Sequence, residues 1–366
     1  MRKKLRQIIT VILTLTLIIS ALSVSALSAD NERKVTETAD YLSRNFSAQV
    51  GSIGGEWSVI GLARCGKLSE EQKQSYYKAV ESYVSSVGSN RLHKRKSSDN
   101  SRVVLALSAI GKNAADINGF NLIQPLSDFE YVKKQGINGV IWALIALDSC
   151  GYYLSDDIRD TLISEILSKQ HNDGGWGLDD TSDPDVTGMA VQSLAPYRAY
   201  DNDIQTAVGN AVIWMTSLKT ENLSPETCAQ LIAAATAQGI NPEDDERFSD
   251  IIDCLMRYST ANGFSHTING EYNQMATEQA FYALVSCERL SNGQTSLYDM
   301  TDISNFEVLD FDNDGKESIN DVTIIQRYIA EFGVEFTTPQ KRRADLNKNG
   351  RIDISDVTKY QQRLAR

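Results

Sequence analysis

Two stretches near the C-terminus place oxygen-bearing side chains at the spacing that a calcium-binding loop requires. Residues 310–321 read DFDNDGKESIND, and residues 345–356 read DLNKNGRIDISD. In such a loop, side-chain oxygens stand at positions 1, 3, 5, 9 and 12, position 7 contributes a carbonyl, and a glycine at position 6 makes the sharp turn. Because calcium prefers these hard oxygen ligands and the pattern occurs twice, we predict two calcium ions.

The two loops supply similar sets of ligands. The first set is Asp310, Asp312, Asp314, the carbonyl of Lys316, Ser318 and Asp321. The second set is Asp345, Asn347, Asn349, the carbonyl of Arg351, Asp353 and Asp356. At position 8 the first loop has Glu317 where the second has the apolar Ile352, so we expect this position to affect how the loops pack or which of them faces a partner.

Another acidic stretch, His171–Tyr197, lies near the middle of the chain and reads HNDGGWGLDDTSDPDVTGMAVQSLAPY. Alone it has the composition of an acid-rich active site. An apolar segment follows directly, however, and helix N-termini favour aspartate as a cap. We therefore predict that the stretch is a turn before a helix, with Asp183 or Asp185 as the N-cap.

Weaker candidates for chemistry are spread over the first 290 residues. Glycoside hydrolysis needs two carboxylates about 5–10 Å apart, and Glu56 with Asp185 or Glu226 could supply them. A sugar or peptide ligand would be held by aromatic faces and bidentate donors. Residues of those types are Trp57, Arg102, Trp176 and Tyr272. Helix capping explains the acids equally well, so both interpretations stay open at this point.

These residues fall on a repeated pattern of helical segments. Six apolar, alanine-rich segments recur at 55–68, 100–113, 138–152, 184–197, 225–240 and 274–290. Amphipathic segments precede them at 30–46, 70–87, 115–135, 155–170, 201–219 and 244–260. A repeat of this length is one helical hairpin. The pattern predicts an all-α fold with apolar inner helices and half-exposed outer helices.

Six such hairpins can close into an α6/α6 toroid or stack as an open solenoid. We favour closure, with the toroid spanning residues 30–300. The stretches QHNDGGWG and PDVTGMAVQSLAPY resemble the repeats of squalene cyclases and protein prenyltransferase β-subunits, whose fold is an α/α toroid. With GEWSVIGLAR, INGVIWALIALDS and SLYDM, they also resemble prenyltransferase-repeat domains of secreted clostridial proteins.

The resemblance implies a fold rather than an activity. Cyclases that protonate an alkene use an Asp-x-Asp-Asp motif, but Thr187 and Gly188 stand where its last two acids would fall. Prenyltransferases hold zinc through Asp-x-Cys and a distant histidine, and here Glu226 and Cys228 match only the spacing of the first pair. No zinc is expected, because the three histidines lack ligand spacing. Whether the toroid is an enzyme stays open.

The composition and the N-terminus restrict the cellular setting. An excess of 48 acidic over 36 basic residues argues against nucleic acid as a partner. Residues 1–29 combine a basic start, an apolar core and small-residue cleavage sites, which predicts a secretory signal peptide. No later segment is apolar enough to predict a membrane span. The five cysteines form no CxxC pair, so buried, unreactive thiols are predicted.

The calcium loops have a resemblance of their own. Each runs into one helix, DVTIIQRYIAEF or DVTKYQQRLAR, without a preceding helix like that of an EF-hand. A duplicated loop and helix of this kind over 305–366 resembles a type I dockerin, similar to ruminococcal and clostridial cellulosomal dockerins. The resemblance implies calcium-dependent docking to a cohesin of a scaffoldin. By analogy, the contact would use Ile319, Asn320, Val322, Gln326 and Arg327, or Ile354, Ser355, Val357, Gln361 and Gln362.

The sequence therefore predicts a secreted cellulosome-type subunit, extracellular or attached to the cell surface through the cellulosome. A dockerin joins it to a scaffoldin, and the toroid serves in plant cell wall polysaccharide degradation or binding. The alternative is that the toroid is itself a glycoside hydrolase or lyase. Its ligand, a glycan or a peptide, is not identified by the sequence.

Overall fold

A computed structural model describes residues 28–366 apart from 153, 155 and 313. The predicted signal peptide, residues 1–29, lies almost wholly outside the described residues and stays a prediction. The first described helix, α2 (Ala29–Arg44), begins at the last of those positions, where the Ser28 side chain accepts a hydrogen bond from the Asn31 backbone N–H. The described part of the chain is mostly helical and has almost no strands, which agrees with the all-α prediction.

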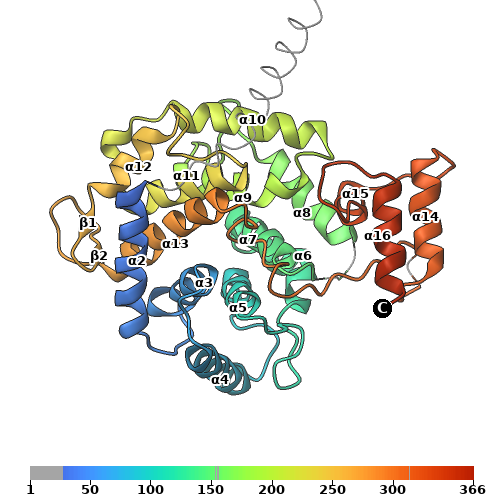
Figure 1. Cartoon of the computed structure of the whole chain (residues 1–366), viewed down its shortest axis with the longest axis horizontal. Coiled ribbons are helices and arrows are strands. Elements are labelled where there is room, and N and C mark those ends of the chain that lie inside the picture. Colours follow the sequence, from blue (N-terminus) through green and yellow to red (C-terminus); the bar gives the residue numbers. More distant parts are fainter. Residues whose placement is uncertain (1–27, 153, 155, 313) are drawn as a thin grey trace, which may run out of the picture.

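Six largely buried helices form the inner layer of the first 300 residues. They are α3 (Trp57–Arg64), α5 (Ser97–Ala109), α7 (Gly136–Asp148), α9 (Pro184–Leu194), α11 (Pro225–Ala237) and α13 (Gln274–Ser291). Each contacts the next along the chain, and α13 contacts α3 (Figure 1). The inner helices thus close into a cycle, which we call the helical ring, and they do not form an open row.

More polar helices lie outside this cycle. They are α2, α4 (Glu70–Val87), α6 (Phe129–Lys133), α8 (Asp156–Ser168), α10 (Asn202–Thr216) and α12 (Ser249–Met256). The expected helix over 115–135 is reduced to a 3-10 turn, Gln124–Ser127, and the short α6. The reason is local: Pro125 has no N–H to donate, and the Asp128 side chain caps a new helix by accepting from the Tyr131 N–H. A two-stranded hairpin, β1 (Ser259–Thr260) and β2 (Gly263–Phe264), was not predicted.

Glycines allow the inner helices to approach closely. A Cβ added at Gly61 of α3 would lie 2.7 Å from the Phe281 ring of α13, at the contact that closes the ring. A Cβ at Gly188 of α9 would lie 2.9 Å from the Gln230 carbonyl oxygen of α11. These distances are shorter than van der Waals contact, so the side chain must be absent at both positions.

Aromatic side chains fill the interior of the ring. The Trp57 ring lies 5.2 Å from Trp142 and 5.8 Å from Tyr282. Tyr298, which follows α13, completes the cluster at 5.8 Å from Trp142. Aromatic pairs at such separations contribute about 0.5–1.5 kcal/mol beyond the area they bury.

The segment after α13 runs across the ends of the inner helices and is held there by buried arginines. Asp302 accepts from Arg64 of α3 and Arg289 of α13, at 2.8 Å each. Further along, the Met300 N–H donates to the Ser149 carbonyl at 2.7 Å, and the Phe306 N–H donates to the Cys150 carbonyl at 2.8 Å.

The C-terminal module has a separate small core. It contains α14 (Ile319–Ile329), α15 (Thr338–Ala344) and α16 (Ile354–Leu364), and α14 packs on α16. Figure 1 shows α15 nearest the ring and α14 farthest from it. The sequence predicts no helix like that of an EF-hand before either calcium loop, but the seven-residue helix α15 ends directly before Asp345.

The five cysteines are all free in the structure, and four of them are buried. Burial raises the pKa of Cys65 to about 12 and that of Cys150 to about 11. At neutral pH these two thiols hold their protons and are poor nucleophiles. Cys254 differs, because its contacts with Cys228 and Arg257 lower its pKa to about 6. Among the described residues, no helix is both long and apolar enough to cross a membrane.

Closure of the ring can be tested at Gly61. We expect Gly61→Ala to lower the free energy of unfolding by about 1–3 kcal/mol, because the added methyl collides with the buried Phe281 ring. Gly209→Ala on α10 is the control, since a Cβ there meets nothing within 4 Å. Because alanine favours a helix more than glycine does, that variant should be about 0.5–1 kcal/mol more stable than the parent. Equal urea denaturation midpoints for the two variants would contradict the close α3–α13 contact.

Candidate calcium loops and polar clusters

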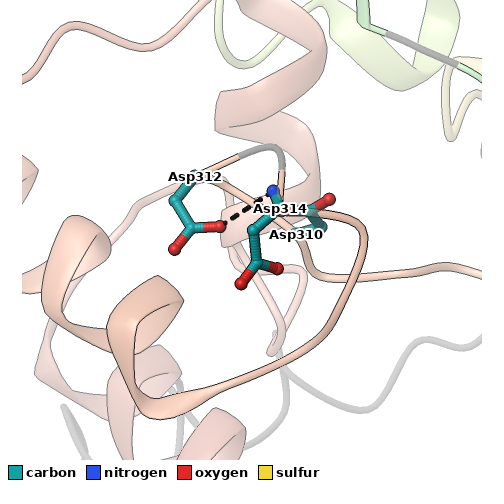
Figure 2. Close-up of side chains that lie close together, drawn as sticks. All are labelled: Asp310, Asp312 and Asp314. Carbon is teal, nitrogen blue, oxygen red and sulfur yellow. Dashed lines mark hydrogen bonds between the residues drawn. The ribbon is translucent and has the colours of Figure 1, made fainter.

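Loop 1, residues 310–321, gathers three carboxylates. One ligand oxygen each from Asp310, Asp312 and Asp314 can be chosen so that all lie within 4.8 Å of one another. Figure 2 shows these side chains around the turn, with the Asp314 N–H donating to the Asp312 carboxylate at 3.1 Å. Arg343 Nη2 donates to the backbone carbonyl of Asp310 at 3.3 Å.

Backbone N–H groups orient the first carboxylate of loop 1. The Asp310 carboxylate accepts from the Asp314 N–H at 3.2 Å and from the Gly315 N–H at 2.8 Å. Gly315 has a φ of +84°, a left-handed conformation that glycine adopts without strain. Gly315 therefore both makes the turn and donates the N–H that orients the Asp310 carboxylate.

The aspartate at position 12 closes each loop onto its helix. Asp321 is fully buried and accepts from the Phe311 N–H at 2.6 Å and from the Ser318 N–H at 2.8 Å. Its counterpart Asp356 accepts from the Asn347 and Asp353 N–H groups, at 3.0 Å each. In both loops this carboxylate also forms half of a capping box at the start of α14 or α16.

Loop 2, residues 345–356, repeats this arrangement with fewer charges. Asp345 accepts from the Asn349 N–H at 3.1 Å and from the Gly350 N–H at 2.6 Å. It has one more partner, because the Tyr200 hydroxyl of the ring donates to the same carboxylate at 2.7 Å. Sequence reasoning missed this contact, since nothing in the pattern around Tyr200 points to a loop that lies so far along the chain.

The carboxylates of loop 1 suit a cation. Desolvation, together with the charges of Asp321, Asp314 and Asp310, raises the pKa of Asp312 above its usual value. Like charges held this close repel one another, and a divalent cation relieves that repulsion. The predicted ligands thus fit calcium by donor type and by spacing.

Glu317, the departure at position 8, connects the two halves of the module. Its carboxylate accepts from the Leu309 N–H at 2.9 Å and from Arg363 Nε of α16 at 3.1 Å. Arg363 also reaches the carbonyl oxygen of Glu307 through Nη2, at 2.6 Å. The charged side chain therefore joins the halves by an ion pair at a place where Ile352 of loop 2 packs by apolar contact.

Two residues expected at a partner interface lie in the core instead. Val322 and Val357 are each 1% exposed and pack between α14 and α16. The other expected contact residues are exposed and remain candidates. They are Ile319, Asn320, Gln326, Arg327, Ile354, Ser355, Gln361 and Gln362.

In the ring, Glu56 belongs to a buried ion pair. Its Oε2 atom lies 3.2 Å from Nε of Arg102, and its Oε1 atom accepts from the Gly51 N–H at 2.9 Å. Arg102 also pairs with Asp99 at 3.0 Å. Glu56 is therefore engaged in an ion pair and a backbone hydrogen bond inside the ring.

A buried carboxyl group, Glu278 of α13, lies near Glu56. Its Oε1 atom accepts from the Ser58 hydroxyl at 2.5 Å and from the Gly54 N–H at 2.9 Å. Its Oε2 atom has no hydrogen-bond partner among the described residues. Burial raises the pKa of Glu278, and the charge of Glu56 adds to the shift.

Asp185 and Glu226 lie in the first turns of α9 and α11, close enough for the charge of Glu226 to act on Asp185. Asp183 caps α9 by accepting from the Val186 N–H at 2.9 Å, which confirms one of the two predicted caps. Burial raises the pKa of Asp185, and the charges of Asp183 and Glu226 contribute to the shift. Glu226 is almost fully buried and lies 2.9 Å from Nδ1 of His266.

The predicted ligand-binding aromatic residues lie mostly in the core. Trp176 is fully buried and donates its indole N–H to the Ile166 carbonyl at 2.7 Å. Trp57 is 9% exposed within the aromatic cluster. Neither tryptophan offers a ring face to a sugar, so neither is placed to bind one. Tyr272 is half-buried beside Tyr41, at a centroid distance of 5.1 Å.

A cavity of about 640 Å³ lies between the ring and the C-terminal module. Its ring side is formed at the C-terminal ends of α7, α9 and α11, by residues such as Asp148, Ser193 and Ala237. Its other side includes Arg342 of α15 and Gln362 of α16. The predicted ligand residues Trp57, Arg102, Trp176 and Tyr272 do not line it.

The C-terminal module matches a known domain family. Residues 308–365 fit the family described as Dockerin type I domain, so this part of the chain is a type I dockerin domain. The match supports calcium binding and docking to a cohesin in a cellulosome-type assembly. It does not extend into the helical ring. No curated protein and no solved structure matches the chain.

Calcium should stabilise the dockerin domain. At a concentration of 100 times Kd, one bound ion adds about 2.7 kcal/mol to the free energy of unfolding. We expect calcium to raise the melting temperature of the parent chain, and Asp310→Ala and Asp345→Ala each to reduce that rise. Asp253→Ala removes an exposed acid of α12 and serves as the control. An identical calcium shift in all four proteins, measured by calorimetry, would contradict the assignment of the ligands.

Proposed function

We propose that this chain is a secreted subunit of a cellulosome-type complex and that its dockerin domain docks to a cohesin of a scaffoldin in a calcium-dependent manner. The observation that carries the proposal is the pair of calcium loops within the region that matches the type I dockerin family. Secretion, with a location outside the cell or on its surface through the complex, rests on the predicted signal peptide.

Two calcium ions have a structural role in this proposal. Asp310, Asp312, Asp314, Ser318, Asp321 and the Lys316 carbonyl would hold one, and Asp345, Asn347, Asn349, Asp353, Asp356 and the Arg351 carbonyl the other. Each ion would neutralise the clustered acids and fix the start of α14 or α16. A module with so small a core gains much of its stability from such ions.

Docking can be tested with purified cohesin modules immobilised on a sensor surface. We expect at least one of them to bind the full chain in calcium and to lose at least about 100-fold in affinity in EGTA, because the loops then lose the charge that orders them. Addition of calcium should restore binding. Failure of every cohesin to bind in calcium would overturn the proposed function, and equal affinity in EGTA would overturn the role of the ions.

For the ring, we propose a prenyltransferase-like toroid that contributes to plant cell wall polysaccharide degradation by binding a glycan. The repeat stretches that resemble prenyltransferase and squalene-cyclase repeats support the fold assignment, and the closed cycle of inner helices agrees with it. Half-buried Tyr272 and Tyr41 are the aromatic residues most suited to a sugar face. A peptide ligand is the other candidate for this surface.

The second candidate function of the ring is glycoside hydrolysis or lyase chemistry. The observation that favours it is the pair formed by Asp185 and Glu226. Burial raises the pKa of Asp185, which suits a proton donor, and the Glu226 carboxylate lies 2.9 Å from Nδ1 of His266. Glu56 is the weaker candidate, because its carboxylate is already paired with Arg102 at 3.2 Å.

Polysaccharide assays separate the two functions of the ring. If it is an enzyme, reducing ends or unsaturated products should form from a plant wall glycan, and Asp185→Asn should lower the rate by about 10²–10⁴-fold. Asp180→Asn, an exposed neighbour in the same stretch, should leave the rate unchanged. If the ring only binds a glycan, binding should be saturable and no cleavage product should form. Tyr272→Ala should then lower the affinity for the glycan. If the Asp185→Asn variant keeps the full rate, Asp185 is not the catalytic acid.

A further inference from the structure

The two halves of the dockerin domain are similar in sequence but differ in what surrounds them. Position 6 shows the difference directly. A Cβ added at Gly315 of loop 1 would meet nothing within 4 Å, whereas one at Gly350 of loop 2 would lie 3.4 Å from Ala199 of the ring. Position 1 shows the same difference. The Tyr200 hydroxyl donates to Asp345, whereas the hydrogen bonds of the Asp310 carboxylate among the described residues come from its own loop.

Further contacts fasten the second half to the ring. Lys348 of loop 2 pairs with Asp299 at 3.0 Å and donates to the Thr301 hydroxyl at 2.8 Å. Arg342 of α15 lies 3.6 Å from the buried Asp148 carboxylate at the end of α7. The hydroxyl of Thr338, also on α15, donates to Asp201 at 2.9 Å.

The first half has no such attachment. Within the part of the chain that the structure describes, no hydrogen bond or ion pair joins loop 1 or α14 to the ring. In Figure 1, α14 lies at the outer edge of the molecule, with α16 and α15 between it and the ring. The ring therefore does not cover the outer side of α14.

Exposed apolar side chains are also distributed unequally. In the first half, Ile319 at the start of α14 is 60% exposed and Phe332 just beyond its end is 68% exposed. Arg327 lies over the Phe332 ring, at 5.6 Å from its centroid. In the second half, Ile354 is 65% exposed, but Lys359 and Gln362 farther along α16 line the cavity that faces the ring.

A stable protein interface buries about 800 Å² on each partner, so it extends beyond the surface of one helix. Large apolar and aromatic side chains with arginine beside them are the usual anchors of such an interface. Loop 1, α14 and Phe332 offer a surface of this kind. A partner lying along α16 would instead meet the ring and the segment that crosses its end.

We propose that the cohesin binds only the first half of this dockerin domain, through loop 1 and the outer face of α14, and that the second half serves as the attachment to the ring. The inference rests on the proposed docking to a cohesin and states which of two similar surfaces performs it. Ile319 and Phe332 are the anchors of this interface with the cohesin.

One pair of substitutions tests the proposal in the full chain. Ile319→Asp and Ile354→Asp place the same charge at equivalent positions of nearly equal exposure. With an immobilised cohesin module in calcium, we expect Ile319→Asp to weaken binding by at least about 30-fold, which is the loss typical of an interface anchor. Ile354→Asp should change the affinity by less than about threefold. A parent-like rise in melting temperature with calcium shows that both variants are folded.

Other outcomes have distinct meanings. A loss caused by Ile354→Asp, or a small effect of both variants, would overturn the choice of the first half. Absence of binding by the parent chain would instead contradict the proposed function, and the present inference with it. Hydrogen exchange of the complex gives an independent readout: residues 316–332 should become protected on binding and residues 351–364 should not, and the reverse pattern would also overturn the proposal.

Discussion

The buried carboxylate of Asp148 determines how the helical ring and the dockerin domain face each other. It lies at the end of α7, 2.8 Å from Nε of Arg159, and accepts from the Tyr197 hydroxyl at 2.6 Å. Arg342 of the dockerin domain approaches the same carboxylate, and its guanidinium lies over the Tyr197 ring. Removing one partner from a buried ion pair typically costs about 3–5 kcal/mol, because the remaining charge is left without compensation. This network therefore fixes α15, and with it loop 2, against the ring.

Acidic residues are accommodated in three physically different ways in this acidic chain. Asp148, Glu56 and Asp302 pair with arginines. Asp185 and Glu278 are shielded from water without an arginine partner, so burial raises the pKa of each. The loop carboxylates accept backbone N–H groups and lie beside one another, which suits a cation. Only the second and third environments leave a carboxyl group in a state useful for proton transfer or metal binding.

The sequence predicted most of what depends on local pattern. The inner helices follow from their apolar, alanine-rich segments, and the calcium loops follow from ligand spacing and glycine at position 6. It failed where a contact depends on distant parts of the chain. Trp57 and Trp176 have the composition of a sugar site, but packing places both in the core. Glu278 and His266 gain their surroundings only when the ring closes. The attachment of loop 2 to Tyr200 and Asp299 could not be predicted, because no local rule specifies how two modules dock.

The hydrogen-bonded segment between the modules has a consequence for assembly. A flexible linker would let an attached module sweep a volume set by linker length, and its effective concentration near a substrate would fall as the linker grew. Here Met300 and Phe306 are bonded to the end of α7, and Tyr152 stacks on Phe306 at 5.2 Å. The ring is thus a rigid extension of the domain that docks. On a scaffold, its orientation would be set by the geometry of docking, so neighbouring subunits would meet a fixed face of it.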